Sequence, residues 1–292
     1  MRFSSQASSV LAVVAVSAFF GACEPRAEAV EEPAQVVSPG SELMAQQAPQ
    51  VQRPTFTGAR GPRMDPSEVS GRWPFYWTRA IYSGYRRGWG GYGSWAIDFP
   101  KGDRQFLFVL KRLVRLDAYD WENAISLADP KLRRFPVIYM VEPGYMDMTE
   151  AEVDGLRGYL DAGGFLIVDD FWGTREWDQF EYNIRRVYPD KAIVDITLDH
   201  NIYSAYYDIE QVMQVPALNN AIYGYTAECR YWPCDPQVKG MYDDEGRLMV
   251  IINFNTDLGD AWEWAEDPRY PLKYSTYAYE MGANMIVYAM SH

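Results

Sequence analysis

Gly163-Gly164-Phe165-Leu166-Ile167-Val168-Asp169-Asp170-Phe171-Trp172-Gly173 is the stretch that decides the fold. Its apolar part, residues 165–168, is unbroken, which is typical of a strand that helices cover on both faces. The two glycines before it predict a tight turn, and the aspartates and Trp172 are expected to emerge where the strand ends. In an open parallel sheet, ligands collect in the crevice beyond the carboxyl ends of the strands. We therefore expect a binding or catalytic site at this point.

Strands and helices alternate on both sides of that stretch. The preceding helix has the clearest signals: Thr149 and Glu152 form a capping box, Met148 and Val153 form a hydrophobic staple, and Gly163 supplies a left-handed C-cap. Further strands are predicted at 75–81, 136–141 and 192–196, and a hairpin at 238–242 and 247–253. Further helices are predicted from about 98 to 116, at 176–187 and from about 275. This alternation predicts an α/β layered domain with a mainly parallel sheet.

The first 23 residues have the pattern of an export signal. Arg2 provides the positive end and residues 10–20 a short apolar segment, and the four residues that end at Cys23 resemble a bacterial lipobox. We therefore expect Cys23 to be lipidated, and Glu24 after it favours the outer membrane over the inner. The alternative is cleavage after Ala29, which would give a soluble secreted protein. The expected location is periplasmic and lipid-anchored.

Residues 24–70 are rich in Pro, Glu, Gln, Ala and Ser and show no apolar periodicity. Such a segment buries too little apolar surface to offset its ordering entropy, so we predict a disordered tether. The folded domain is expected at 71–292. The formal net charge of −13 argues against a nucleic-acid partner.

The chain has three cysteines, an odd number for an exported protein. If Cys23 carries lipid, Cys229 and Cys234 remain as a pair in an oxidising compartment, and we expect a disulfide between them. A zinc site at this pair would need two further ligands, and none is evident nearby.

Several polar residues at predicted strand ends are candidates for a site. Asp169 and Asp170 could act as an acid/base pair or as ligands for a hard cation, although one of them is expected to cap the helix that follows. Arg79 could form a buried bridge with Asp170 or Glu142, or it could bind a carboxylate of a ligand.

The remaining candidates have weaker signals. His200 is the one internal histidine, and a lone histidine is more typical of a hydrogen-bonded structural residue than of a base. Asn253, Asn255 and Asp257 alternate past a strand and could orient a ligand or bind calcium, but turn stabilisation is the favoured interpretation. The Gly-x-Gly-x-x-Gly pattern at 88–93 does not lead directly from a strand into a helix, so no dinucleotide is expected. We expect no cofactor and no metal.

Four motifs together resemble the domain-of-unknown-function family 4159, over residues 75–292. They are Thr78-Arg79-Ala80-x-Tyr82-Ser83-Gly84, Asp98-Phe99-Pro100-Lys101-x-Asp103-Arg104-Gln105-Phe106, Gly163-Gly164-Phe165-Leu166-x-x-Asp169-Asp170-Phe171 and Gly282-Ala283-Asn284. The resemblance implies a flavodoxin-like sheet similar to that of class I glutamine amidotransferases and ThuA-like proteins. It also implies envelope partners linked to MoxR-type ATPases and von Willebrand A proteins.

The amidotransferase reaction itself is not expected. Its nucleophilic cysteine sits at the turn after a strand, where this chain has Asp170-Phe171-Trp172. ThuA-like proteins carry an Asp-His pair to which Asp199-His200 is similar.

These residues lead to two functional hypotheses. The first is a membrane-tethered periplasmic binding or assembly module without catalytic activity. Its ligand would contact six residues: Arg79, Asp98, Asp170, Trp172, His200 and Asn255. The alternative is a hydrolase of envelope carbohydrate or peptide that uses Asp170 with His200 or Glu142 as acid and base.

Overall fold

The computed structural model describes residues 75–85, 93–229 and 234–292. The expected signal peptide, the tether, residues 71–74 and most of the glycine-rich loop lie outside the described residues. In the described ranges, every helix is too short or too polar to cross a membrane.

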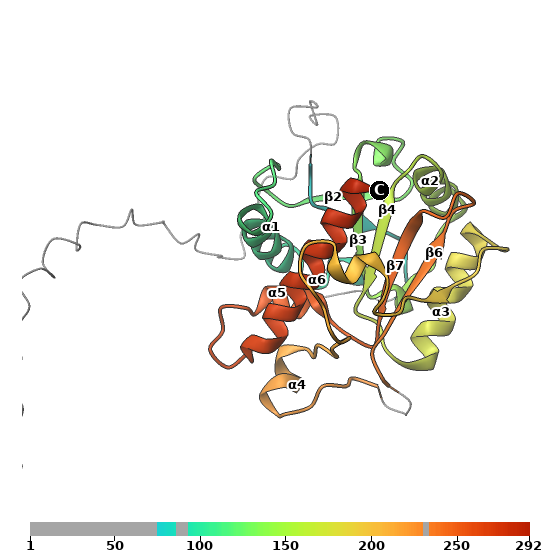
Figure 1. The fold of residues 1–292 in the computed structure, drawn as a ribbon. Helices are drawn as coiled ribbons and strands as arrows, with labels where there is room; N and C mark the ends of the chain where they lie inside the picture. The colour runs from blue at the N-terminus through green and yellow to red at the C-terminus, as the bar shows by residue number, and fades with distance from the viewer. Residues whose placement is uncertain (1–74, 86–92, 230–233) are drawn as a thin grey trace, which may run out of the picture. The chain divides into compact units, whose positions relative to one another are not determined.

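Within these residues, the strands form one seven-stranded sheet in the order β2-β1-β3-β4-β7-β6-β5 (Figure 1). The strands β1, β2, β3, β4 and β7 run parallel. At one edge, β6 pairs antiparallel with β7, and β5 pairs antiparallel with β6. The bounds are β1 Thr78–Ile81, β2 Asn123–Ser126, β3 Val137–Val141, β4 Phe165–Asp169, β5 Val194–Asp195, β6 Gln237–Tyr242 and β7 Leu248–Phe254. The stretch quoted first thus forms the central strand, and the predicted α/β class with a mainly parallel sheet is confirmed.

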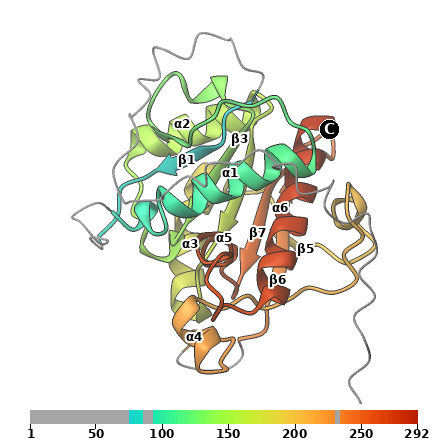
Figure 2. The ribbon, with the colours of Figure 1, turned by 90° about the vertical axis from the view of Figure 1, so that its left-hand side faces the viewer.

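Helices cover both faces of this sheet. The α-helices are α1 Lys101–Leu113, α2 Glu150–Asp161, α3 Gly173–Val187, α4 Leu218–Ile222, α5 Leu258–Glu263 and α6 Leu272–Ser291. The short 3-10 helices are η3 Ser94–Ala96, η4 Leu132–Arg134, η5 Pro143–Tyr145 and η6 Asn201–Ser204. Helices α1, α5 and α6 lie on one face, and α2 and α3 lie on the other (Figures 1 and 2).

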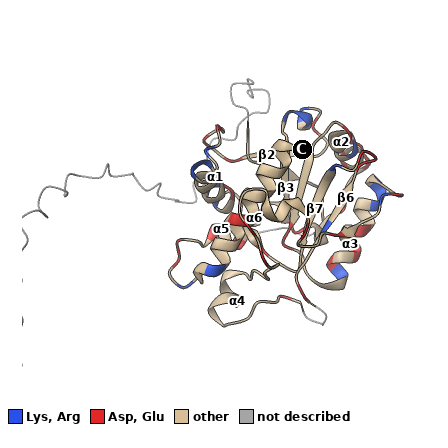
Figure 3. Cartoon of the chain, viewed as in Figure 1, with Lys and Arg blue, Asp and Glu red and all other residues tan. Residues whose placement is uncertain are grey.

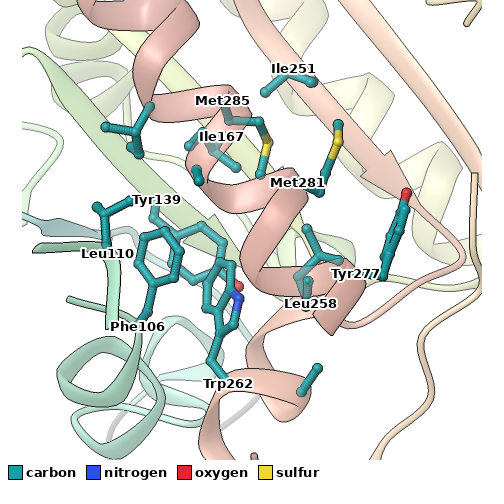
Figure 4. Close-up of a cluster of buried hydrophobic side chains, with 14 of the residues drawn as sticks. Phe106, Leu110, Tyr139, Ile167, Ile251, Leu258, Trp262, Tyr277, Met281 and Met285 are labelled. Carbon is teal, nitrogen blue, oxygen red and sulfur yellow. The ribbon is translucent and has the colours of Figure 1, made fainter. Parts of the chain in front are cut away.

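The side chains of β4 alternate between the two helical layers, as the pleat of a strand requires. Phe165 and Ile167 belong to the core under α1, α5 and α6, whereas Leu166 and Val168 belong to the core under α2 and α3. Figure 4 shows part of the first core. Burial of each such side chain stabilises the fold by roughly 1.5–3 kcal/mol.

Two of the expected signals of α2 are present. Thr149 and Glu152 form the capping box, and Gly163 follows the helix with a φ of 95°. Other elements differ from prediction. The first strand begins at Thr78 rather than residue 75, and β2, α4 and α5 were not expected. They are four, five and six residues long, too short for an apolar period to reveal them.

Candidate functional site: a carboxyl cluster at the strand ends

The chain turns sharply where the parallel strands end. Glu142, Asp170 and Asn255 directly follow β3, β4 and β7, and each has a positive φ, between 51° and 58°. Asp98, which follows η3 by two residues, has a φ of 60°. This left-handed conformation costs a residue other than glycine roughly 1–3 kcal/mol, and such positions gather at functional sites. In this protein, the left-handed conformation changes the direction of the backbone directly after β3, β4 and β7, and the side chains there change direction with it.

Backbone hydrogen bonds hold these turns against one another. Glu142 N donates to Asp170 O at 3.1 Å, and Asp170 N donates to Thr256 O at 3.2 Å. Asn255 N in turn donates to Phe171 O at 3.0 Å. The contacts between the strands therefore continue past the ends of β3, β4 and β7, and the site is built on backbone that the sheet orders.

Asp169 is the last residue of β4 and is fully buried. Its Oδ2 accepts hydrogen bonds from Tyr139 Oη at 2.7 Å, Leu258 N at 2.9 Å and Gly259 N at 3.2 Å. Asp169 thus satisfies the first N–H groups of α5, which leads away from β7. Burial raises the pKa of Asp169 to about 7 even with these three donors.

The expectation that Asp169 or Asp170 caps the next helix in the chain, α3, was wrong. The N-cap of α3 is Trp172, whose N–H donates to Glu176 Oε2 at 2.7 Å. Asp170 cannot serve there because its backbone has already turned left-handed, and its Oδ1 accepts from Trp172 Nε1 at 3.1 Å.

Five carboxyl groups meet at this edge of the sheet and are called the acidic cluster below. They are Asp98, Asp170, Asp257, Asp260 and Glu263. One carboxylate oxygen from each of Asp98, Asp170 and Asp257 lies within 4.8 Å of the other two, and the same holds for Asp98, Asp260 and Glu263. Asp98 belongs to both groups and links them. Figure 3 shows acidic residues on α5.

Burial and mutual repulsion perturb the whole acidic cluster. Burial, followed by repulsion from Asp260 and Glu263, raises the pKa of Asp98 well above its ordinary value. The pKa values of Asp170 and Asp257 are raised well above theirs, first by burial and then by nearby carboxylates. Burial and then Asp260 raise the pKa of Glu263 to about 7. Each group therefore ionises less readily than an isolated carboxyl group, and a positive charge beside the cluster would reverse this shift.

Two cations lie next to the cluster among the described residues. Arg79 is fully buried, and its guanidinium pairs with Asp103, neither with Asp170 nor with Glu142, the two partners considered from the sequence. Its Nη1 donates to the carbonyls of Trp95 and Ile97 at 3.1 and 2.9 Å. Arg79 is therefore a structural residue whose charge is already matched.

Lys101 is the second of these cations. Its Nζ lies 4.0 Å from Glu263 Oε1 and 3.6 Å from the centre of the Trp264 ring. The charge of Arg79 is already balanced by Asp103, which lies outside the acidic cluster. Lys101 therefore offsets only a small part of the negative charge of the cluster.

The structure does not bring His200 to this site. Its ring centre lies 5.5 Å from that of Tyr288 and 6.2 Å from that of Tyr242. Tyr242 pairs with Leu248, the first residue of β7, whereas Asp170 contacts Thr256 beyond its last residue. At about 3.3 Å per residue, the length of β7 places Tyr242, and His200 beside it, about 20 Å from Asp170. Asp170 and His200 cannot share a proton or a ligand atom at that separation.

Asn255 lies at the site edge, but its side chain serves the fold. Its Oδ1 accepts from Gly173 N at 2.9 Å, and its Nδ2 donates to Asp235 O at 2.9 Å. The expected disulfide between Cys229 and Cys234 is present, and Sγ of Cys229 lies 3.4 Å from Asn255 Oδ1. Turn stabilisation, the interpretation favoured for this residue, describes these bonds.

Of the six residues expected to contact a ligand, the structure brings Asp98 and Asp170 together with Trp172 beside them. The sequence interpretation did not include Asp260 and Glu263 among the site residues, and for Asp257 it favoured turn stabilisation over ligand or calcium binding. A usable signal was present: Asp257 followed three residues later by Asp260 is an N-terminal helix pattern, and Asp257 Oδ1 indeed accepts from Asp260 N at 2.8 Å.

A family model described as Domain of unknown function (DUF4159) matches residues 84–290. The chain belongs to this family. No curated protein matches it.

Proposed function

We propose that this family member is a membrane-tethered periplasmic binding or assembly module, whose ligand engages the acidic cluster. The tether would begin at a lipidated Cys23 and extend to residue 70, so that the domain could reach envelope partners. Proteins linked to MoxR-type ATPases and von Willebrand A domains are candidate partners, as the family resemblance implies.

One observation carries the proposal. The turn after the central strand brings Asp170 to the site, with Trp172 Nε1 donating to it, at the position where an amidotransferase-like enzyme would present its nucleophile. Asp98 and Glu263 are half-buried, so the cluster is open to solvent on their side. A group of carboxyl side chains that is partly accessible and held on ordered backbone suits binding.

The alternative hydrolase now rests on Asp170 with Glu142, because His200 lies at the other end of β7. Its support is the raised pKa of Asp170, caused by burial and then by Glu142, which suits a general acid.

A comparison of variants separates the two functions. The full lipidated chain, Asp170→Asn and the control Asp190→Asn are used to capture partners from envelope extracts and are incubated with purified peptidoglycan. Asp190 is exposed and follows α3, so its substitution makes the same charge change away from the cluster. A binding module predicts partners captured by the wild type and the control but lost in Asp170→Asn. Peptidoglycan fragments released by the wild type and not by Asp170→Asn would overturn it in favour of the hydrolase.

The anchor has a separate test. A fatty-acid analogue should label the wild-type chain and not Cys23→Ser. Labelling that persists in Cys23→Ser would refute the lipid anchor at that residue.

A further inference from the structure

We propose that Asp98, Asp170 and Asp257 bind a hard divalent cation, for which Ca²⁺ is the best fit. The inference names the ligand class of the site described above, and in that respect it rests on the proposed function. It departs from the expectation, drawn from sequence alone, that the chain has no metal site.

The spacing of the oxygens suits calcium. No two of the three ligand atoms lie more than 4.8 Å apart. Two oxygens on opposite sides of a Ca²⁺ ion, each at about 2.4 Å, are about 4.8 Å apart, so all three carboxylates can reach one ion. Mg²⁺ is usually held by one or two carboxylates and keeps several waters, so three carboxylates favour Ca²⁺.

The hydrogen bonds leave oxygens available. Trp172 Nε1 donates to Oδ1 of Asp170, and Asp260 N donates to Oδ1 of Asp257, which leaves the second oxygen of each carboxylate for a ligand. These bonds also orient both side chains, as neighbouring groups commonly do for metal ligands.

Asp98 supplies an independent observation. Its Oδ2 is buried and has no hydrogen-bond partner in the part of the chain that the structure describes. A buried carboxylate oxygen without a donor is costly, and a cation would remove that cost. This oxygen lies beside the Asp257 carboxylate, because a Cβ added to Gly259 would lie 2.6 Å from it and 3.4 Å from Oδ1 of Asp257. Gly259 is thus the residue that makes room for these two carboxylates.

The surrounding charge favours the same ligand. Asp260 and Glu263 lie beside Asp98 as a second layer of negative charge, and Lys101 offsets only part of it. Three carboxylates supply at least three of the six to eight oxygens that Ca²⁺ takes, so water or oxygen atoms of a partner would complete the shell. A calcium ion would thereby give the binding module a contact for a carboxylate or hydroxyl-rich partner.

Calcium titration of the full chain tests the proposal. The chain is treated with EDTA and dialysed, then titrated with CaCl₂ by calorimetry and followed by thermal unfolding. We expect one Ca²⁺ per chain, and at a hundred times Kd a rise in Tm of about 5–10 °C. Asp170→Asn and Asp257→Asn should each weaken binding by about tenfold or more, whereas Asp190→Asn should bind like the wild type. MgCl₂ should bind more weakly than CaCl₂.

Unfolding of the variants without calcium shows whether weaker binding simply reflects a loss of folding. Without calcium, Asp170→Asn should unfold at a temperature equal to or above that of the wild type, because one repelling charge is gone. Asp257→Asn keeps an N-cap side chain for α5 and provides a second folded variant. An unchanged wild-type Tm with CaCl₂, or equal calcium affinity in both variants and the wild type, would overturn the inference.

The two proposals fail differently. Partner capture that requires Asp170, in a chain that shows no calcium binding by calorimetry, would remove the calcium site and leave the binding module. If the chain binds calcium but captures no partner through Asp170, the calcium site would stand and the binding module would be refuted.

Discussion

Replacement of Arg79 by methionine should destabilise the domain far more than the loss of a charge at its surface. The guanidinium donates to Asp103 through Nε at 3.2 Å and Nη2 at 2.5 Å, and both side chains are fully buried. Burial alone would lower the pKa of Arg79, but the adjacent Asp103 carboxylate holds it above its ordinary value. The guanidinium of Arg79 is therefore charged at neutral pH.

The expected magnitude follows from what the substitution leaves behind. Asp103 would remain buried with Trp77 Nε1 as its donor at 2.9 Å, and the carbonyls of Trp95 and Ile97 would lose Arg79 Nη1. Removing one partner of a buried ion pair costs about 3–5 kcal/mol, and an unsatisfied buried polar group costs about 1–3 kcal/mol more. The free energy of unfolding should thus fall by about 5 kcal/mol, a large part of the roughly 5–15 kcal/mol of an ordinary domain.

Urea unfolding followed by tryptophan fluorescence measures this loss. Lys111→Met is the matched control, because it removes a cation whose partner, Asp120, is exposed, and it should cost no more than about 1 kcal/mol. The double variant Arg79→Met/Asp103→Leu should recover much of the stability, since no buried charge then remains unpaired. A loss in Arg79→Met as small as that in Lys111→Met would refute the reasoning.

Two further predictions concern Asp169 and Gly155. The pKa of Asp169, raised by burial to about 7, means that the native state holds a proton that the unfolded chain releases near pH 4. In EDTA, the free energy of unfolding should therefore fall as pH rises from about 4 to about 7, by up to about 4 kcal/mol, and Asp169→Asn should lose that part of the slope; equal slopes in urea titrations would contradict this. Gly155→Ala would place a Cβ 1.9 Å from Leu127 O, so Tm should drop by several degrees, whereas Gly163→Ala meets no atom within 4 Å and should show only the strain of its φ of 95°.

The sequence was most informative where one local rule dominated. The run from Phe165 to Val168 is wholly apolar, and the structure places it at the centre of the sheet. Likewise, the capping box of Thr149 and Glu152 requires only a spacing of three residues, and it marks the start of α2. Such features depend on neighbours along the chain, so no knowledge of the fold was needed.

Partners that lie far apart in sequence were not predictable in the same way. The chain has 40 acidic residues, and Arg79 could pair chemically with any that the fold brings close. The partner is Asp103 because α1 packs on the face of the sheet toward which Arg79 points. His200 lies in an irregular segment whose path no periodicity predicts, and antiparallel β6 places that segment near the start of β7.

The buried ion pair and the acidic cluster are physically linked through η3. Arg79 binds the carbonyl of Ile97, the residue directly before Asp98, and so fixes the backbone from which Asp98 turns toward Asp170 and Asp257. Holding Asp98 in its left-handed conformation, beside carboxylates that repel it, requires such an anchor, because repulsion alone would move the loop away. The buried pair of Arg79 and Asp103 thus has a local role, because it holds the Asp98 carboxylate at the position where a cation can bind.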